Sequence, residues 1–120
     1  TITDSTIADN LNGGVCSHLA TVIVNRTSIV SNSGFYGAGI FNRGGTLTVA
    51  NSTLSGNTSG SHYGGGLYNS ASGKVTIDAT IVADNSASYG AGIWNDSGAV
   101  TIVDSQISGN HWASMGGGIS

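Results

Sequence analysis

Five ungapped copies of one ten-residue pattern predict that this chain is an all-β solenoid. The copies span residues 1–10, 23–32, 48–57, 76–85 and 101–110, and they recur about every 25 residues. A fixed period of this length is typical of a stack in which each repeat forms one coil. We expect a single right-handed parallel β-helix with three sides and about five coils, approximately residues 1–21, 22–46, 47–74, 75–99 and 100–120.

The spacing of the apolar residues defines the three sides. The distance from the first side to the second is always seven residues, whereas the distance from the second to the third varies from 8 to 13. Two corners of each coil are therefore expected to be constant and one to be variable. The landmarks are Val22, Leu47, Val75 and Val100 on the first side, Ile7, Ile29, Leu54, Val82 and Ile107 on the second, and Val15, Ile40, Leu67, Ile93 and Ile119 on the third.

An unbroken column of asparagines ends every copy of the pattern. Stacked Asn amides hydrogen-bond one another between layers, and Asn also suits a tight turn. We predict that this structural ladder turns the chain at the end of the second side. Its members are Asn10, Asn32, Asn57, Asn85 and Asn110.

Glycines precede the third side in four copies, as GAGI (37–40), GGGL (64–67), GAGI (90–93) and GGGI (116–119). Glycine permits a tight bend and a close approach of two backbones. A nucleotide-binding interpretation of the G-x-G spacing is rejected, because no Lys and no helical pattern follow it.

Composition narrows the class of protein. Gly, Ser, Thr and Asn make up half of the chain, only 8% of the residues are charged, proline is absent, and the formal net charge is −3. Without a basic stripe or a long apolar run, we expect neither nucleic-acid binding nor membrane insertion. The lone Cys16 cannot form a disulfide within the chain.

Aromatic residues recur beside the third side and form the candidate contact face. One column is predicted to be Phe41, Tyr68 and Trp94, and a second to be Tyr36, Tyr63 and Tyr89, with Trp112 at the variable corner. Two interpretations stay open: rings that only stack along the solenoid, or a ridge that contacts a glycan or a protein.

These motifs resemble two groups of bacterial cell-surface repeat proteins. The matching residues are Thr53-Leu54-Ser55-Gly56-Asn57 together with Gly64-Gly65-Gly66-Leu67-Tyr68-Asn69, whereas the first copy departs as Gly13-Gly14-Val15-Cys16-Ser17. One group is the polymorphic outer-membrane protein repeat, and the other comprises long arrays of the type TLTVSNSTISGN…GGGIYN found in autotransporter-like passengers. The resemblance implies a parallel β-helix and a passenger, adhesin or fibre, and it carries over no catalytic residue.

Titratable residues show no convergent pattern. Asp4 and Asp104 fall in one column four coils apart, and His18, His62 and His111 fall at unrelated positions. We therefore expect no catalytic residue, metal site or cofactor, and a polysaccharide-active enzyme is a minor alternative. Arg26 follows Asp4 by one coil, which predicts a surface ion pair.

The functional prediction is an extracellular, cell-surface β-solenoid with a structural or adhesive role. Both ends fall inside predicted strands, so we expect coils to continue, either in a longer chain or by end-to-end stacking of subunits into a filament. A glycan- or protein-binding module that uses the aromatic face is the alternative. Ice binding by the outward threonines Thr48, Thr76 and Thr101 is a minor one.

Overall fold

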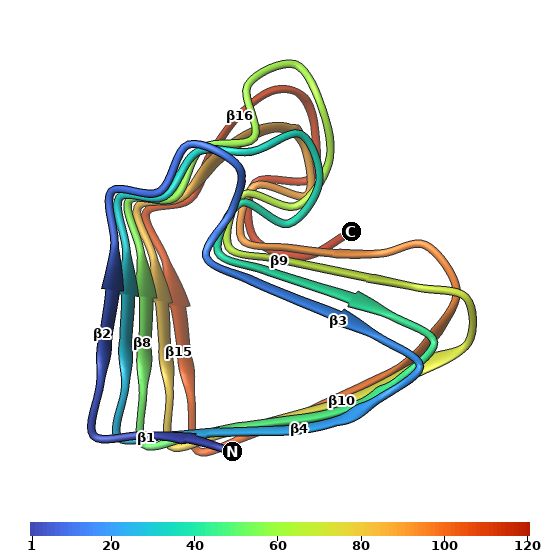
Figure 1. Ribbon diagram of the computed structural model, residues 1–120. Helices are drawn as coiled ribbons and strands as arrows, with labels where there is room; N and C mark the ends of the chain where they lie inside the picture. The colour runs from blue at the N-terminus through green and yellow to red at the C-terminus, as the bar shows by residue number, and fades with distance from the viewer.

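The computed structural model describes the backbone of residues 1–120 and all side chains except those of residues 112 and 113. The chain winds as a parallel β-solenoid with a triangular cross-section (Figure 1). Four coils carry a strand on all three sides, and the fifth reaches the third side only through the bridge between Ile93 and Ile119. The expected all-β solenoid is confirmed, with the last of its five coils incomplete.

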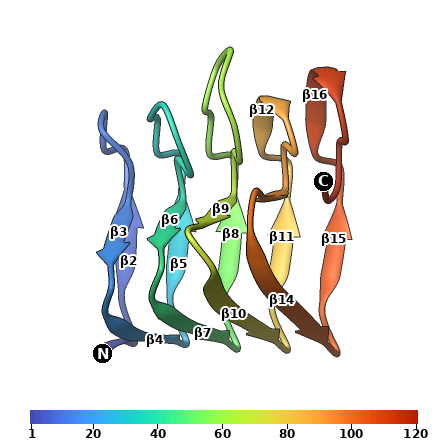
Figure 2. The ribbon, with the colours of Figure 1, turned by 90° about the vertical axis from the view of Figure 1, so that its right-hand side faces the viewer.

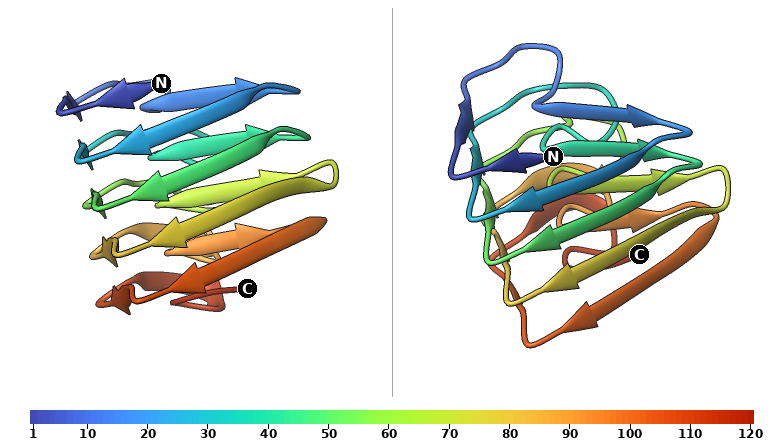
Figure 3. Two further views of the ribbon diagram at one scale, coloured as in Figure 1. Left: turned by 90° about the horizontal axis from the view of Figure 1, so that it is seen from below. Right: turned by 60° about the horizontal axis from the view of Figure 1, so that its bottom comes forward.

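Each side of the triangle is a parallel sheet whose strands come from successive coils, as the stacked arrows in Figure 3 show. Sheet A contains β1 (Ile2–Thr3), β4 (Thr21–Asn25), β7 (Thr46–Ala50), β10 (Gly73–Asp78) and β14 (Gly98–Val103). Sheet B contains β2 (Thr6–Ala8), β5 (Ser28–Val30), β8 (Thr53–Ser55), β11 (Ile81–Ala83) and β15 (Gln106–Ser108). Sheet C contains β3 (Val15–His18), β6 (Ile40–Arg43), β9 (Leu67–Ser70) and β13 (Ile93–Asn95).

The register of the sheets places equivalent residues of successive repeats directly next to one another. Val75 pairs with Leu47 and Val100 in sheet A, and Ile40 pairs with Leu67 in sheet C. Because side chains alternate across a strand, each apolar landmark points inward over its equivalent. The three columns enclose one continuous core, in which Ile29, Leu47, Leu54, Leu67 and Ile93 are among the residues fully buried.

The corner between sheets B and C differs from coil to coil, as the loops of unequal height in Figure 2 show. In the last two coils it forms two short strands, β12 (Ser86–Tyr89) and β16 (His111–Met115), which pair as a separate parallel sheet. The sequence predicted the variable length of this corner but not these two strands.

The asparagine column forms a continuous hydrogen-bonded ladder inside that corner. The side-chain amides join Asn10 to Asn32 at 2.8 Å, Asn32 to Asn57 at 3.1 Å, Asn57 to Asn85 at 2.9 Å and Asn85 to Asn110 at 3.0 Å. Each bond runs from Nδ2 of one coil to Oδ1 of the next.

The ladder satisfies every polar atom of its buried members. Asn57 is fully buried. Its Nδ2 donates to the Ile29 carbonyl and to Asn85 Oδ1, and its Oδ1 accepts from both the backbone N–H and Nδ2 of Asn32. An amide has two donor hydrogens and two acceptor lone pairs, so this side chain carries no desolvation penalty from a missing partner.

A second column of hydroxyls fixes the corner between sheets A and B. Ser52 Oγ accepts the backbone N–H of Thr27 at 3.1 Å and donates to the Ala50 carbonyl at 2.6 Å. Thr80 Oγ1 does the same one coil later, for the Ser52 N–H and the Asp78 carbonyl. The side chains thus bond successive coils where the backbone changes direction and leaves its sheet pairing.

In the first four coils, the glycine before the third-side apolar residue is required by the close approach of the next coil. A Cβ on Gly66 would lie 2.6 Å from the Gly92 carbonyl oxygen and 3.0 Å from Asn85 Nδ2. Backbone atoms cannot yield by the distance that such a contact demands. The equivalent Gly118 differs, because a Cβ there would have as its nearest neighbour Ile107 Cγ2, at 3.7 Å.

This contrast predicts different outcomes for one substitution at two equivalent positions. Gly66→Ala should lower the free energy of unfolding by about 1–3 kcal/mol, because the new methyl group overpacks the coil interface. Gly118→Ala should leave it unchanged or raise it slightly, since alanine restricts the unfolded chain. Urea unfolding followed by circular dichroism measures both values, and equal losses in the two variants would contradict the steric explanation.

Candidate aromatic binding groove

The strands of sheet C present opposite side chains to the core and to solvent. In β6, Ile40 and Asn42 are buried, whereas Phe41 is half-buried and Arg43 is exposed on the outer surface. The same alternation in β9 and β13 turns Tyr68 and Trp94 outward. Because Phe41 pairs with Tyr68 and Tyr68 with Trp94, the three residues form one outward column.

A second aromatic column lies beside the first. Tyr36 pairs with Tyr63, and Tyr63 with Tyr89, through isolated backbone bridges just before the glycine turns. The two columns also touch each other: the ring centroids of Tyr36 and Tyr68 are 5.6 Å apart, and those of Tyr63 and Trp94 are 5.0 Å apart. The candidate contact residues on these two columns are therefore adjacent.

Most rings within a column face one another along the solenoid. Phe41 and Tyr68 are almost parallel, with an interplanar angle of 8° and a centroid distance of 5.1 Å, and Tyr36 and Tyr63 are parallel within 10° at 6.0 Å. Trp94 is tilted, at 45° to Tyr63 and 64° to Tyr89. Each such pair contributes about 0.5–1.5 kcal/mol beyond the apolar area it buries, so the stacking interpretation has direct geometric support.

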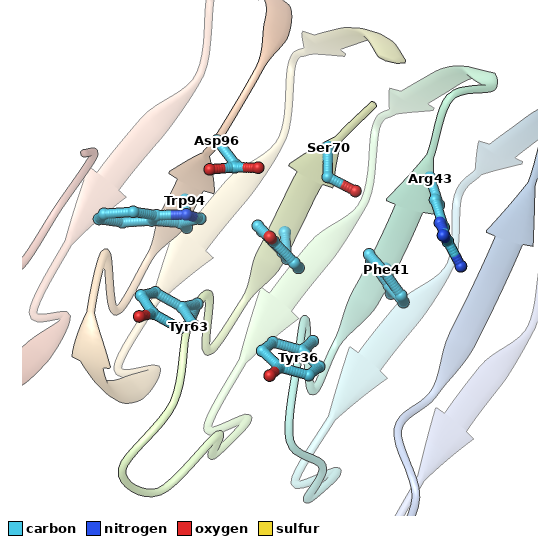
Figure 4. A pocket seen from close by; sticks show the side chains of 8 residues that line it. Tyr36, Phe41, Arg43, Tyr63, Ser70, Trp94 and Asp96 are labelled. Carbon is cyan, nitrogen blue, oxygen red and sulfur yellow. The ribbon is translucent and has the colours of Figure 1, made fainter. Parts of the chain in front are cut away.

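The two columns and a third row of polar residues line an open groove of about 470 Å³, which we call the aromatic groove (Figure 4). Its aromatic lining consists of Tyr36, Phe41, Tyr63, Tyr68 and Trp94. Tyr89 stacks on Tyr63 at 4.9 Å but does not line the groove. The side chain of Trp112 is outside the described residues.

The polar row of the groove is Arg43, Ser70 and Asp96. Arg43 pairs with Ser70 in the sheet, and Asp96 follows Asn95 at the equivalent place one coil later. Figure 4 shows Arg43 and Asp96 at opposite ends of the groove with Ser70 between them. These residues were missed at the sequence level, because a column of Arg, Ser and Asp has no common chemical type.

Neither charged residue of the groove is neutralised by the protein. The described side chains form one ion pair, which lies on another part of the surface and joins Arg26 Nε to Asp4 Oδ1 at 2.6 Å. That pair was predicted, and its hydrogen bond lowers the pKa of Asp4 while raising the pKa of Arg26. Arg43 and Asp96 therefore face solvent as unpaired opposite charges.

A second asparagine ladder lies directly behind the aromatic column. Asn42 Nδ2 donates to Asn69 Oδ1 at 2.9 Å, and Asn69 Nδ2 donates to Asn95 Oδ1 at 2.8 Å. The aromatic-Asn pair in each copy was the sequence signal for it, but the predicted ladder included only the other column. This ladder fixes the strands whose outward residues form the groove floor.

The second ladder is interrupted in the first coil, where Ser17 pairs with Asn42. Ser17 Oγ and Asn42 Oδ1 are both buried, and neither has a hydrogen-bond partner among the described residues. Serine is too short to reach the next coil as an asparagine does. The interruption coincides with the departure of the first copy from the repeat motif.

The histidines remain apart in the structure. His62 packs against Phe35, with ring centroids 5.0 Å apart and an interplanar angle of 83°. Within the described part of the chain, no three His, Cys, Asp or Glu side chains are grouped so that they could hold a metal ion. Nor do the described residues include a helix with the length and apolar character of a membrane span.

Comparison with known families agrees with this geometry. A family model described as "Right handed beta helix region" matches residues 1–120. The chain belongs to the right-handed β-helix family. This β-helix therefore has the winding that the parallel crossovers predicted, and its family includes both enzymes and structural proteins. No curated protein and no solved structure matches this chain.

The interrupted ladder leads to a prediction of increased stability. Ser17→Asn should raise the free energy of unfolding by about 1 kcal/mol, because the new amide gives Asn42 Oδ1 its missing donor. Ser17→Ala is the matched control: it should raise the free energy of unfolding only slightly, because it removes the buried unpaired hydroxyl but leaves Asn42 Oδ1 without a donor. Chemical denaturation measures both, and an asparagine variant no more stable than the alanine variant would contradict the ladder extension.

Tyr68 provides a reporter for the environment of the groove. Burial raises the pKa of its phenol above the ordinary value of 10.0, and the nearby Asp96 carboxylate raises the pKa further. In a titration of the tyrosine ring carbons by NMR, Tyr68 should ionise above pH 10, and Asp96→Asn should lower its pKa. Since the folded state holds this proton more tightly than the unfolded state, stability should fall as the pH rises past 10. A Tyr68 pKa unaffected by Asp96→Asn would show that the two groups do not interact.

Proposed function

We propose that this β-helix is an extracellular, non-enzymatic surface protein with a structural and adhesive role, and that it contacts a glycan through the aromatic groove. The observation that carries the proposal is the groove itself, in which an aromatic floor lies beside unpaired polar groups. Binding sites commonly combine aromatic surface with a few placed polar groups. The resemblance to bacterial surface repeat proteins supports the location and the adhesive role.

The scaffold suits such a role because its rigidity comes from repeated local bonds. Two asparagine ladders and a hydroxyl column connect neighbouring coils. These bonds fix the strands whose outward residues form the contact surface. End-to-end stacking of subunits stays a prediction within this proposal.

The distribution of acidic residues favours adhesion over catalysis. Asp4 and Asp104 belong to the same corner of coils one and five, and Asp9 and Asp84 to the next corner of coils one and four. Acid–base catalysis requires the participating groups within hydrogen-bond reach of one substrate. In the aromatic groove, by contrast, the lone carboxylate is Asp96, and its neighbours are aromatic rings and a serine.

A glycan-array experiment with aromatic variants tests the proposal. Trp94→Ala should reduce binding to the recognised glycans about ten-fold or more, as expected for loss of a large aromatic contact. Phe35→Ala is the matched control, because Phe35 is a more exposed aromatic residue (66%) that does not line the groove. Its binding should equal that of the unmodified protein.

Circular dichroism of each variant separates loss of the groove from loss of the fold. Trp94→Phe, which keeps an aromatic ring at the position, should retain part of the binding. If the unmodified protein binds no glycan, or if Phe35→Ala and Trp94→Ala lose binding equally, the proposed function is wrong.

A further inference from the structure

We infer that the outer face of sheet A binds the same face of a second copy of this chain, in a side-by-side dimer whose two-fold axis is parallel to the solenoid axis. This interface is distinct from the aromatic groove, which lies on sheet C, and from end-to-end stacking, which would use the ends of the stack. Three features of the face carry the inference: its small side chains, the two charges on β10, and the match of each outward column with its counterpart in the second copy.

The outer face of sheet A is covered mostly by small side chains. Figure 3 (left) views this sheet from outside, with its strands in front of the rest of the chain. Because the strands pair in register, their outward residues form three columns parallel to the solenoid axis, which we call the lysine, central and aspartate columns. In that order, the columns are Thr21, Thr46, Lys74 and Ala99; Ile23, Thr48, Thr76 and Thr101; and Thr3, Asn25, Ala50, Asp78 and Val103.

This face exposes apolar groups that a second copy would cover. Ile23 is 42% exposed and Val103 is 44% exposed, and each outward threonine adds a methyl group. Side chains as short as these allow a second sheet to approach to the usual face-to-face distance of about 10 Å. The five strands cover roughly 400 Å² per copy, at about 3.3 Å per residue and about 4.8 Å between strands. An area this small predicts a weak dimer that depends on concentration.

The two charged residues of this face, Lys74 and Asp78, both belong to β10. They point outward from one strand, four residues and therefore about 13 Å apart, so they are too distant to pair with each other. The one ion pair of the described side chains, between Arg26 and Asp4, does not include them. Each charge would gain an opposite partner from a second β10 that runs across it in the reverse direction.

A two-fold axis parallel to the solenoid axis supplies that arrangement. Rotation about such an axis reverses every strand and keeps the order of the coils. With the axis over the central column, Lys74 faces Asp78 of the second copy, and Asp78 faces Lys74 of the second copy. The same rotation brings Ile23 against Ile23 and Ala99 against Val103, so each kind of side chain meets a compatible one. A surface that is complementary to itself in this way is the requirement for a two-fold interface.

Other arrangements do not satisfy the charges. A two-fold axis parallel to the strands opposes members of the same column, so Lys74 would face Lys74, a threonine or Ala99 of the second copy. The strands of sheet B contain no charged residue, so that face has no charge to select a register. Sheet A, in the reversed-strand arrangement, is therefore the face that the charges select.

Exchange of the two charges tests the interface, by sedimentation velocity of the full 120-residue chain at low ionic strength. The unmodified protein should dimerise with a Kd of about 0.1 mM, and added salt should weaken the dimer. Lys74→Asp or Asp78→Lys alone should raise the Kd about ten-fold or more, because like charges then face each other across the interface. The double variant, Lys74→Asp with Asp78→Lys, should return the Kd to within about three-fold of the unmodified value, since every facing pair again has opposite charges.

A mixture of the two single variants separates the interface from general charge effects. In the mixed dimer two carboxylates of one copy face two ammonium groups of the other, so the mixture should dimerise although neither variant does so alone. Both variants stay net negative, because the chain starts at −3 and each substitution changes the charge by two units. Attraction between whole molecules therefore cannot explain the mixed dimer. Asp9→Lys is the matched control: it makes the same charge change at the exposed corner after β2 and should leave the Kd unchanged. Circular dichroism checks the fold of each variant.

Zero-length carbodiimide cross-linking checks the register of the dimer. Lys74 is the only lysine of the sequence, and Asp78 of the same copy is out of its reach, so a link between these residues must join two copies. Mass spectrometry of mixed isotope-labelled and unlabelled protein should find that link.

The inference is overturned if the protein stays monomeric at about 1 mM, well above the expected Kd. It is also overturned if the single variants dimerise as the unmodified protein does, if neither the double variant nor the mixture restores the dimer, or if Lys74 links to another carboxylate of the second copy instead. Each of these results would leave glycan adhesion standing, because the aromatic groove lies on sheet C.

Discussion

The hydrogen bonding between successive coils is the constraint on which the rest of this structure depends. Parallel strands lie about 4.8 Å apart, and the backbone fixes that distance for every residue of the coil, whatever its side chain. Side chains at equivalent positions must therefore be compatible with copies of themselves at this spacing. Asparagine meets the condition inside the corner, since the amide of Asn57 bonds both neighbouring coils and leaves no polar atom unsatisfied. Glycine meets it at Gly66, where a carbonyl oxygen of the next coil occupies the space of a Cβ.

The same spacing organises the outer surface. Rings at equivalent positions are held at a distance close to that of stacked aromatic groups, so Phe41 and Tyr68 pack face to face. Tyr36 of the second column contacts both rings. The second ladder, through Asn42 and Asn69, supports this surface from behind. An interior satisfied by hydrogen bonds and an exterior of stacked rings thus arise from one repeated strand, in which inward and outward residues alternate.

Much of this architecture could be predicted from the sequence, because the repeat reports its own register. The constant interval of seven residues between Leu47 and Leu54, or Val75 and Val82, placed the first two sides and the turn between them. The unbroken asparagine column identified the ladder at the variable corner. The second ladder was harder to recognise for two reasons. Ser17 interrupts it, and the aromatic residue before each asparagine indicated a surface contact rather than a buried hydrogen bond. The strands β12 and β16 could not be predicted, since their segments differ in sequence and length.

The groove shows why a binding surface on a repeat protein is less predictable than its fold. Folding requires like residues to stack, so the positions that form the core and the ladders can be recognised in the sequence by their period. Recognition requires a departure from periodicity, because a uniform column offers a ligand no direction. Arg43, Ser70 and Asp96 occupy one column with three different chemistries, and in the described structure neither charged member has a charged partner. The chemistry of a ligand is therefore set by the few positions where the repeat is broken, on a surface whose geometry the unbroken positions fix.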